Sequence, residues 1–127
     1  MRPLTLILVT LALVATLAAC RSDGSAANPS VPAPASLPVT LADFSIEPTT
    51  LETGSSVVLE VSNDGPTPHN LTVRDDAGEI LMATADLRRD QAETISAELP
   101  AGEYITFCSL PGHESLGMRG SLTVAAP

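Results

Sequence analysis

Apolar and polar residues alternate from residue 38 to residue 127, and this alternation constrains the fold more than any other feature of the chain. The inward-facing members of the four clearest runs share even spacings: Val57, Leu59 and Val61; His69, Leu71 and Val73; Ile95, Ala97 and Leu99; Met118, Leu122 and Val124. A period of two is typical of β-strands with one face on a core. Turn-forming residues separate the runs at 63–66, 76–78 and 100–102. The pattern predicts an all-β domain, an antiparallel Greek-key β-sandwich or barrel, with a helical turn allowed only at 87–90.

The N-terminal segment predicts export and a lipid anchor. Arg2 precedes an apolar run from Leu4 to Ala19, which is the layout of a secretory signal. The run is too short for a confident membrane span. Leu17-Ala18-Ala19-Cys20 resembles the bacterial lipobox, in which the cysteine is lipid-modified and becomes the first mature residue. The alternative is an ordinary signal peptide with an incidental cysteine.

These features divide the chain into three parts. Residues 1–19 are expected to be a lipoprotein signal peptide, and 20–37 the lipid-anchor cysteine with a flexible linker rich in Pro, Ser and Ala. Residues 38–127 form the predicted domain. The expected location is extracytoplasmic, on a bacterial membrane to which Cys20 is anchored.

The net charge of −9 limits the classes of partner. All six basic residues are arginine, against fifteen acidic residues. Nucleic acid is excluded as a partner because its phosphates require many basic side chains. The charge fits either a basic protein partner, whose approach it would accelerate, or a requirement for solubility alone.

The two cysteines, Cys20 and Cys108, point to a metal. In an exported protein two cysteines ordinarily form a disulfide. A lipidated Cys20 would leave Cys108 as a lone thiol in an oxidising compartment, where it oxidises unless something occupies it.

The segment from Cys108 to Met118 carries the chemistry. It has the spacing Cys-x4-His-x4-Met, with His113 in the middle, and His69 is the only other histidine. Two imidazoles, a thiolate and a weak axial thioether make up a blue-copper site. Pro111-Gly112 is expected to turn the loop. Zinc accepts Cys and His but has no use for the thioether. Met82 is a competing axial ligand, although its apolar neighbours favour a core position.

These residues resemble the plastocyanin and azurin family of blue-copper proteins, the cupredoxins. The resemblance rests on Asn63-x-Gly65-x-x-x-His69-Asn70-Leu71 and on the stretch from Gly102-Glu-Tyr104 through Cys108-x-x-Pro111-Gly112-His113 to Gly117-Met118-x-Gly120-x-Leu122-x-Val124. The two gaps between ligands are similar to the rusticyanin arrangement. The resemblance implies a cupredoxin-like fold with copper on His69, Cys108, His113 and Met118. It also implies that the Asn70 backbone N–H bonds the cysteine sulfur while its side chain ties the two ligand loops together.

The expected function is one-electron transfer by a single type 1 copper, not catalysis. Multicopper enzymes need further histidines, and this chain has none to spare. Leu110, Pro111, Leu116 and Gly117 are expected to form an apolar docking patch around His113. The partner is expected to be a redox protein, for which a membrane-bound respiratory complex is the candidate. The alternatives are a copper-binding or delivery protein in copper homeostasis and a metal-free adhesion sandwich.

Overall fold

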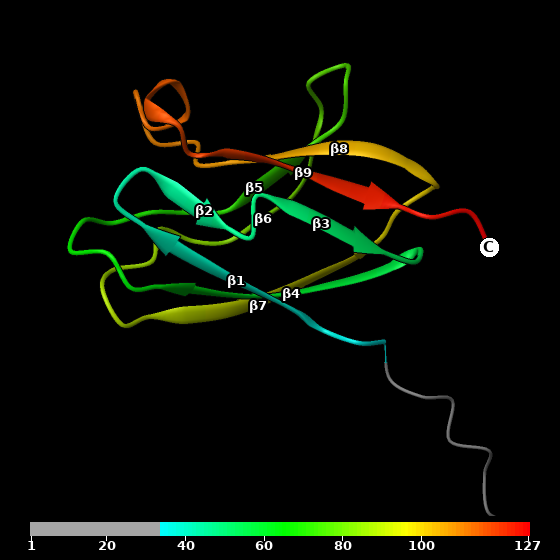
Figure 1. The fold of residues 1–127 in the computed structure, drawn as a ribbon, viewed down its shortest axis with the longest axis horizontal. Helices are drawn as coiled ribbons and strands as arrows, with labels where there is room; N and C mark the ends of the chain where they lie inside the picture. Colours follow the sequence, from blue (N-terminus) through cyan, green and yellow to red (C-terminus); the bar gives the residue numbers. More distant parts are fainter. Residues whose placement is uncertain (1–33) are drawn as a thin grey trace, which may run out of the picture. The chain divides into compact units, whose positions relative to one another are not determined.

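The computed structural model describes residues 34–127, which contain nine β-strands and one turn of 3₁₀ helix (Figure 1). The strands are β1 (Leu37–Ala42), β2 (Ser45–Glu47), β3 (Thr50–Thr53), β4 (Ser56–Asn63), β5 (Thr72–Arg74), β6 (Ile80–Ala83), β7 (Ala92–Glu98), β8 (Gly102–Phe107) and β9 (Arg119–Val124). The 3₁₀ turn, η1 (Glu114–Leu116), lies between β8 and β9. The expected all-β fold is confirmed.

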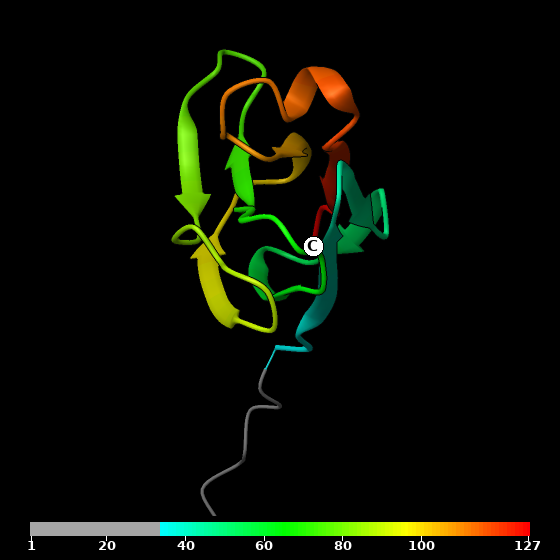
Figure 2. The same cartoon turned by 90° about the vertical axis from the view of Figure 1, so that its left-hand side faces the viewer.

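The strands form two sheets that pack face to face. One sheet has the order β2-β1-β4-β7 and the other β3-β9-β8-β5-β6, and the two layers are visible in Figures 1 and 2. Within residues 34–127 the sheets make a sandwich and do not close into a barrel.

Two strand pairings differ from the expected antiparallel arrangement. Strand β1 runs parallel to β4, and β3 runs parallel to β9, so both sheets are mixed. The physical reason is that the chain changes sheets after the β1–β2 hairpin. Strand β3 joins the second sheet beside β9, and β4 returns to the first sheet in the direction of β1.

The core lies between the sheets and follows the predicted alternation. In β4, Val57, Leu59 and Val61 are fully buried, whereas the residues between them are partly or fully exposed. Leu71 and Val73 from the β5 region and Leu122 and Val124 from β9 meet them in one cluster. Each such side chain contributes about 1.5–3 kcal/mol when it leaves water.

The ends of the domain bear on three other expectations. Strand β1 begins at Leu37, one residue before the expected start of the domain. The expected signal peptide, Cys20 and residues 20–33 of the linker lie outside the described residues. Over the range 34–127, no helix is long and apolar enough to cross a membrane.

The helical turn that the sequence allowed at 87–90 does not form. Leu87 instead makes a β-bridge with His69, and the helical turn lies at η1.

Candidate metal centre

A loop between β8 and β9 carries three of the four predicted ligands. Cys108 directly follows the end of β8, and Met118 directly precedes β9. The Cys108 N–H donates to the Met118 carbonyl at 3.1 Å, and the Met118 N–H donates to the His113 carbonyl at 3.1 Å. The loop turns at Gly112 and Gly117, which have φ angles of 83° and 116°. Both angles fall in the left-handed region that glycine adopts at little cost.

His69 reaches the same place from the connection between β4 and β5. Its backbone exchanges two hydrogen bonds with Leu87, at 3.0 and 2.7 Å. Asn63, at the end of β4, donates from Nδ2 to the carbonyls of Thr67 and Leu87, each at 2.8 Å. These bonds fix the backbone of the segment that carries the His69 side chain.

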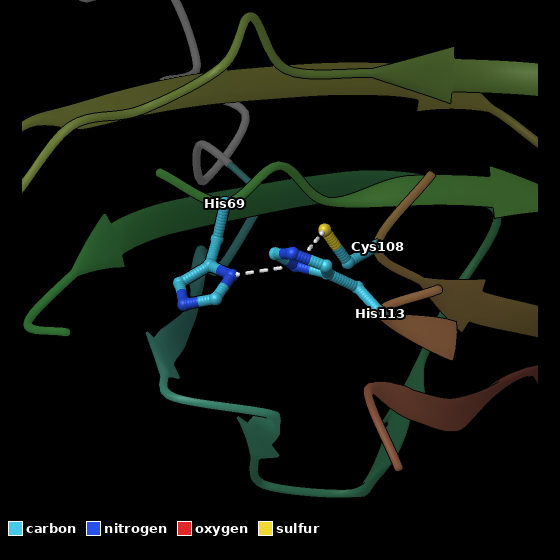
Figure 3. Close-up of side chains that lie close together, drawn as sticks. All are labelled: His69, Cys108 and His113. Carbon is cyan, nitrogen blue, oxygen red and sulfur yellow. Dashed lines mark hydrogen bonds between the residues drawn. The ribbon is translucent and has the colours of Figure 1, made fainter. Parts of the chain in front are cut away.

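The structure brings His69, Cys108 and His113 together. His69 Nδ1 lies 3.1 Å from His113 Nδ1, and Cys108 Sγ lies 3.5 Å from His113 Nδ1 (Figure 3). One donor atom of each residue lies within 4.8 Å of the other two. His69 and Cys108 are fully buried, whereas His113 is half-buried.

The donor set fits a copper ion. Ions of this size bind imidazole nitrogen at about 2.0 Å and thiolate sulfur at about 2.3 Å, so ligands of a trigonal site stand roughly 3.5–3.8 Å apart. The observed separations of 3.1 and 3.5 Å approach that spacing. Two imidazoles and a thiolate are the equatorial ligands of a blue-copper site.

Met118 is fully buried, and its backbone bonds both Cys108 and His113. Its role as the axial ligand stays a prediction. The competitor Met82 lies on β6 opposite Val73 and belongs to the hydrophobic core cluster.

Asn70 makes the contacts that the family resemblance implied. Its backbone N–H points at Cys108 Sγ, 3.5 Å away. Its side chain donates to the Ser109 hydroxyl at 2.9 Å and accepts from the Ser109 N–H at 2.8 Å. It also donates to the Asp86 carboxylate at 2.8 Å, a contact that no sequence signal predicted. Asn70 therefore ties the loop of His69 to the loop of Cys108.

Two side chains outside the expected set contact the outer nitrogen of His69. Thr67 Oγ1 lies 3.0 Å from His69 Nε2, and Asp43 Oδ1 lies 3.4 Å from it. The Thr67 hydroxyl donates to Asp43 at 2.8 Å. That bond, with a smaller contribution from His69, lowers the pKa of Asp43 below its ordinary value, against a cost of desolvation. Asp43 was missed because it sits in the turn between β1 and β2, and no local signal shows where that turn packs.

A second missed group anchors η1 to the sheet. Both terminal nitrogens of Arg74 on β5 donate to the Glu114 carboxylate, at 3.1 and 2.7 Å, and Arg119 also donates to it. The hydrogen bond from Arg74 is the largest cause that lowers the pKa of Glu114, with Arg119 adding to it. The Arg74 guanidinium also stacks 4.1 Å above the ring of Phe107. Glu114 follows His113 directly, so the two arginines hold the loop that carries this predicted ligand.

Exposed apolar residues occur on the loop of His113 and in the β1–β2 turn beside it. Leu116 is 61% exposed and Phe44 40% exposed, and the Phe44 ring centre lies 5.3 Å from that of His113. Pro111 and Gly117 are exposed, whereas Leu110 is partly buried against the core. Leu116 and Pro111 are thus exposed residues of the His113 loop, and their docking role stays a prediction. Phe44 is an apolar neighbour of His113 that the sequence did not reveal.

Comparison with solved structures places the fold. A dithionite-reduced auracyanin from the photosynthetic bacterium Roseiflexus castenholzii matches with a TM-score of 0.65 at 20% identity, covering 72% of this chain and 97% of that one. Auracyanin A from Chloroflexus aurantiacus matches with a TM-score of 0.63 at 18% identity, covering 73% and 100%. A variant of amicyanin matches with a TM-score of 0.56 at 22% identity, covering 70% and 81%. Identities this low establish the fold alone.

Comparison with curated protein sequences finds no match. Comparison with protein families gives one that spans nearly the whole chain, described as "Cupredoxin-like domain", over residues 7–124. The two-sheet sandwich and the His-Cys-His group agree with that match. The chain belongs to the cupredoxin-like domain family.

Proposed function

We propose that the domain is a type 1 copper protein that works as a one-electron carrier. His69, Cys108 and His113 are the equatorial ligands of a single ion, and Met118 is the axial ligand. The observation that carries the proposal is the convergence of two imidazole nitrogens and one thiol sulfur within 4.8 Å. Auracyanin A, whose fold this chain shares, is described as a "blue" copper protein.

Electron transfer suits this site better than catalysis. When bound, copper supplies a one-electron change between Cu(II) and Cu(I). His69 and Cys108 are buried, so the protein leaves little room for a substrate at the ligands. The chain has two histidines and both belong to the group, so none remains for a second metal centre.

The surrounding residues keep the ligand geometry fixed. Asn70 ties the two ligand loops together, and Arg74 with Arg119 holds Glu114 beside His113. These hydrogen bonds resist movement of the ligands when the charge at the site changes. The reorganisation energy of electron exchange therefore stays low.

The docking surface of the carrier is the apolar area formed by Phe44, Pro111 and Leu116 around His113. His113 is the half-buried member of the ligand group, so its ring brings the site closest to a partner. The occupant is a redox protein with an apolar surface of its own. The acidic charge of the chain favours a basic rim on that partner.

The carrier works at a membrane surface in this proposal. Cys20 holds a lipid anchor, and the Pro- and Ser-rich residues after it act as a tether. The domain is then extracytoplasmic and confined near membrane proteins, among which a respiratory complex is the candidate redox partner. Radiolabelled palmitate should enter the wild-type protein in a bacterial host but not the Cys20→Ala variant.

Copper delivery is the competing function, and one experiment separates the two. The copper-loaded protein is cycled through repeated reduction and reoxidation in the presence of a Cu(I)-binding acceptor. A carrier retains its copper and returns the same spectrum after each cycle. Transfer of the metal to the acceptor within a few cycles would favour delivery instead.

A further inference from the structure

The outer side of the His69 ring faces a turn from another part of the sheet. Asp43 and Phe44 form the turn between β1 and β2, and Phe44 has a φ of 58°, unusual for a residue other than glycine. The Phe44 ring makes T-shaped pairs with the rings of His69 and His113, with centre-to-centre distances of 6.4 and 5.3 Å. Asp43 projects its carboxylate toward His69 Nε2. One turn therefore contacts both imidazoles of the site.

The hydrogen bonds around Nε2 fix where the proton of His69 resides. An ionised carboxylate only accepts hydrogen bonds, so the single Thr67 hydroxyl proton is committed to Asp43 Oδ1 at 2.8 Å. Thr67 Oγ1 therefore directs a lone pair, not a proton, at His69 Nε2, 3.0 Å away. Asp43 Oδ1 presents a second acceptor at 3.4 Å. Two acceptors at one ring nitrogen require that this nitrogen carry the hydrogen.

The consequence falls on the other ring nitrogen. A neutral imidazole with its proton on Nε2 has a lone pair on Nδ1. Nδ1 is the atom that faces His113 Nδ1 at 3.1 Å within the ligand group. The opposite tautomer would point an N–H into the site and set the Nε2 lone pair against two oxygen acceptors.

We propose that Asp43 and Thr67 are positioning residues that hold His69 in its metal-binding tautomer and tune the site through its outer nitrogen. The tautomer part stands on the geometry alone, and the tuning part rests on the proposed copper function. A carboxylate bonded to the outer N–H of a ligating histidine makes the ligand more basic. A more basic ligand stabilises Cu(II) more than Cu(I), so the pair lowers the reduction potential.

A purely structural role makes a different prediction. Asp43 and Thr67 are both exposed, and their mutual bond also pins the β1–β2 turn to the β4–β5 connection. If that were their only role, substitutions would change stability and leave the His69 tautomer and the potential unaltered.

The first measurement uses the metal-free protein and so does not depend on copper binding. The ring ¹⁵N shifts of His69 are recorded at about pH 8, where an ordinary histidine is neutral. Wild type and the conservative Thr67→Ser variant are expected to carry the proton on Nε2. The double variant Asp43→Ala/Thr67→Val is expected to show a mixture of tautomers. An unchanged Nε2–H form in the double variant would overturn the proposal. Should that variant not fold, the same readout is taken on Asp43→Ala alone, in which the Thr67 hydroxyl proton is free to donate to Nε2 and the same mixture of tautomers is expected.

The second measurement is the reduction potential of the copper-loaded protein. Loss of an outer partner typically lowers metal affinity about 10–100-fold. We expect the double variant to lose about tenfold more affinity for Cu(II) than for Cu(I), because the more basic ligand favours Cu(II). A tenfold difference raises a one-electron potential by about 59 mV. Asp64→Asn is the matched control, because Asp64 is an exposed acid on the loop of Thr67 that takes no part in the His69 bonds described here.

The possible results separate the two proposals. Potentials that change equally in the double variant and in Asp64→Asn would overturn the tuning role, because net charge alone would explain them. A wild-type protein that takes up no copper would sink the proposed function, while the tautomer measurement would still decide the role of Asp43 and Thr67.

Discussion

Arg74 on β5 donates hydrogen bonds from both terminal nitrogens to the Glu114 carboxylate, at 3.1 and 2.7 Å. These bonds join the sheet to the loop that carries His113. Paired bonds between a guanidinium and a carboxylate fix direction as well as distance. Arg119 adds a bond from β9. The loop of His113 is thus held from both sides by side chains outside the predicted ligand set.

Glu114→Gln is expected to lower the free energy of unfolding by about 1 kcal/mol at neutral pH, because a partly exposed bidentate pair contributes about this much. The pKa of Glu114 in the folded protein lies below its ordinary value of 4.5. A carboxyl with a lowered folded pKa stabilises the fold above pH 4.5, and the gain is lost as pH falls through the folded pKa. Denaturant unfolding of wild type and Glu114→Gln should be measured from neutral pH to well below pH 4.5. The difference in their free energy of unfolding should disappear at the acid end.

Glu103→Gln serves as the control for that series, because Glu103 is an exposed β8 residue whose loss changes net charge by the same amount. Equal effects of the two substitutions at neutral pH would contradict the role of Glu114 as an anchor.

Removal of the Asn70 side chain should destabilise the domain. Asn70→Ala leaves the Ser109 N–H without its acceptor and cuts the tie between the ligand loops. We expect a loss of about 2 kcal/mol, which is typical when a buried polar group loses its partner. Ser109→Ala removes only a hydroxyl and should cost clearly less. Thermal unfolding of the metal-free proteins measures both, and equal losses would count against the tie.

The axial ligand can be identified with two methionine variants. Met118→Leu preserves the apolar volume of a fully buried side chain and removes the sulfur. If Met118 is the axial ligand, the protein keeps copper and its potential rises by on the order of 59 mV, a tenfold shift toward Cu(I). Met82→Leu should leave the potential where it is, and the reverse result would assign the axial position to Met82.

The docking patch is tested by electron self-exchange between copies, measured by NMR on mixed oxidised and reduced protein. The chain has a net charge of −9, so an added arginine weakens repulsion between copies and by itself accelerates exchange. Leu116→Arg is nevertheless expected to slow exchange about tenfold, because it places a hydrated charge in the apolar contact. Ile80→Arg, at a 52% exposed residue on β6, gives the electrostatic effect alone. Faster exchange in both variants would place the contact elsewhere.

The sequence predicted that Cys108 and His113 would lie together because their signals are local, and the structure places both beside His69. The spacing from Cys108 to Met118 lies within one loop, which joins β8 to β9. The alternation in β4 and β9 likewise predicted which side chains face the core. Asn70 was placed through the family resemblance, and the structure gives it the implied contacts with Cys108 and Ser109.

The remaining features depend on where distant segments meet. From the sequence, Asp43 is indistinguishable from an ordinary turn residue, and only the packing of the β1–β2 turn brings it close to His69. The parallel pairing of β1 with β4 arises from a change of sheet that periodicity does not report. The sequence at 87–90 allowed a helical turn, but the Leu87 backbone forms a β-bridge with His69 instead.

The central claim is that Cys108 is the thiolate ligand of a copper ion. The most direct test adds Cu(II) to the purified protein and to the Cys108→Ser variant and records their visible absorption. We predict an intense blue thiolate-to-copper charge-transfer band in the wild type and none in the variant. A wild-type protein that is folded and stays colourless, or a variant with the same band, would contradict the copper assignment.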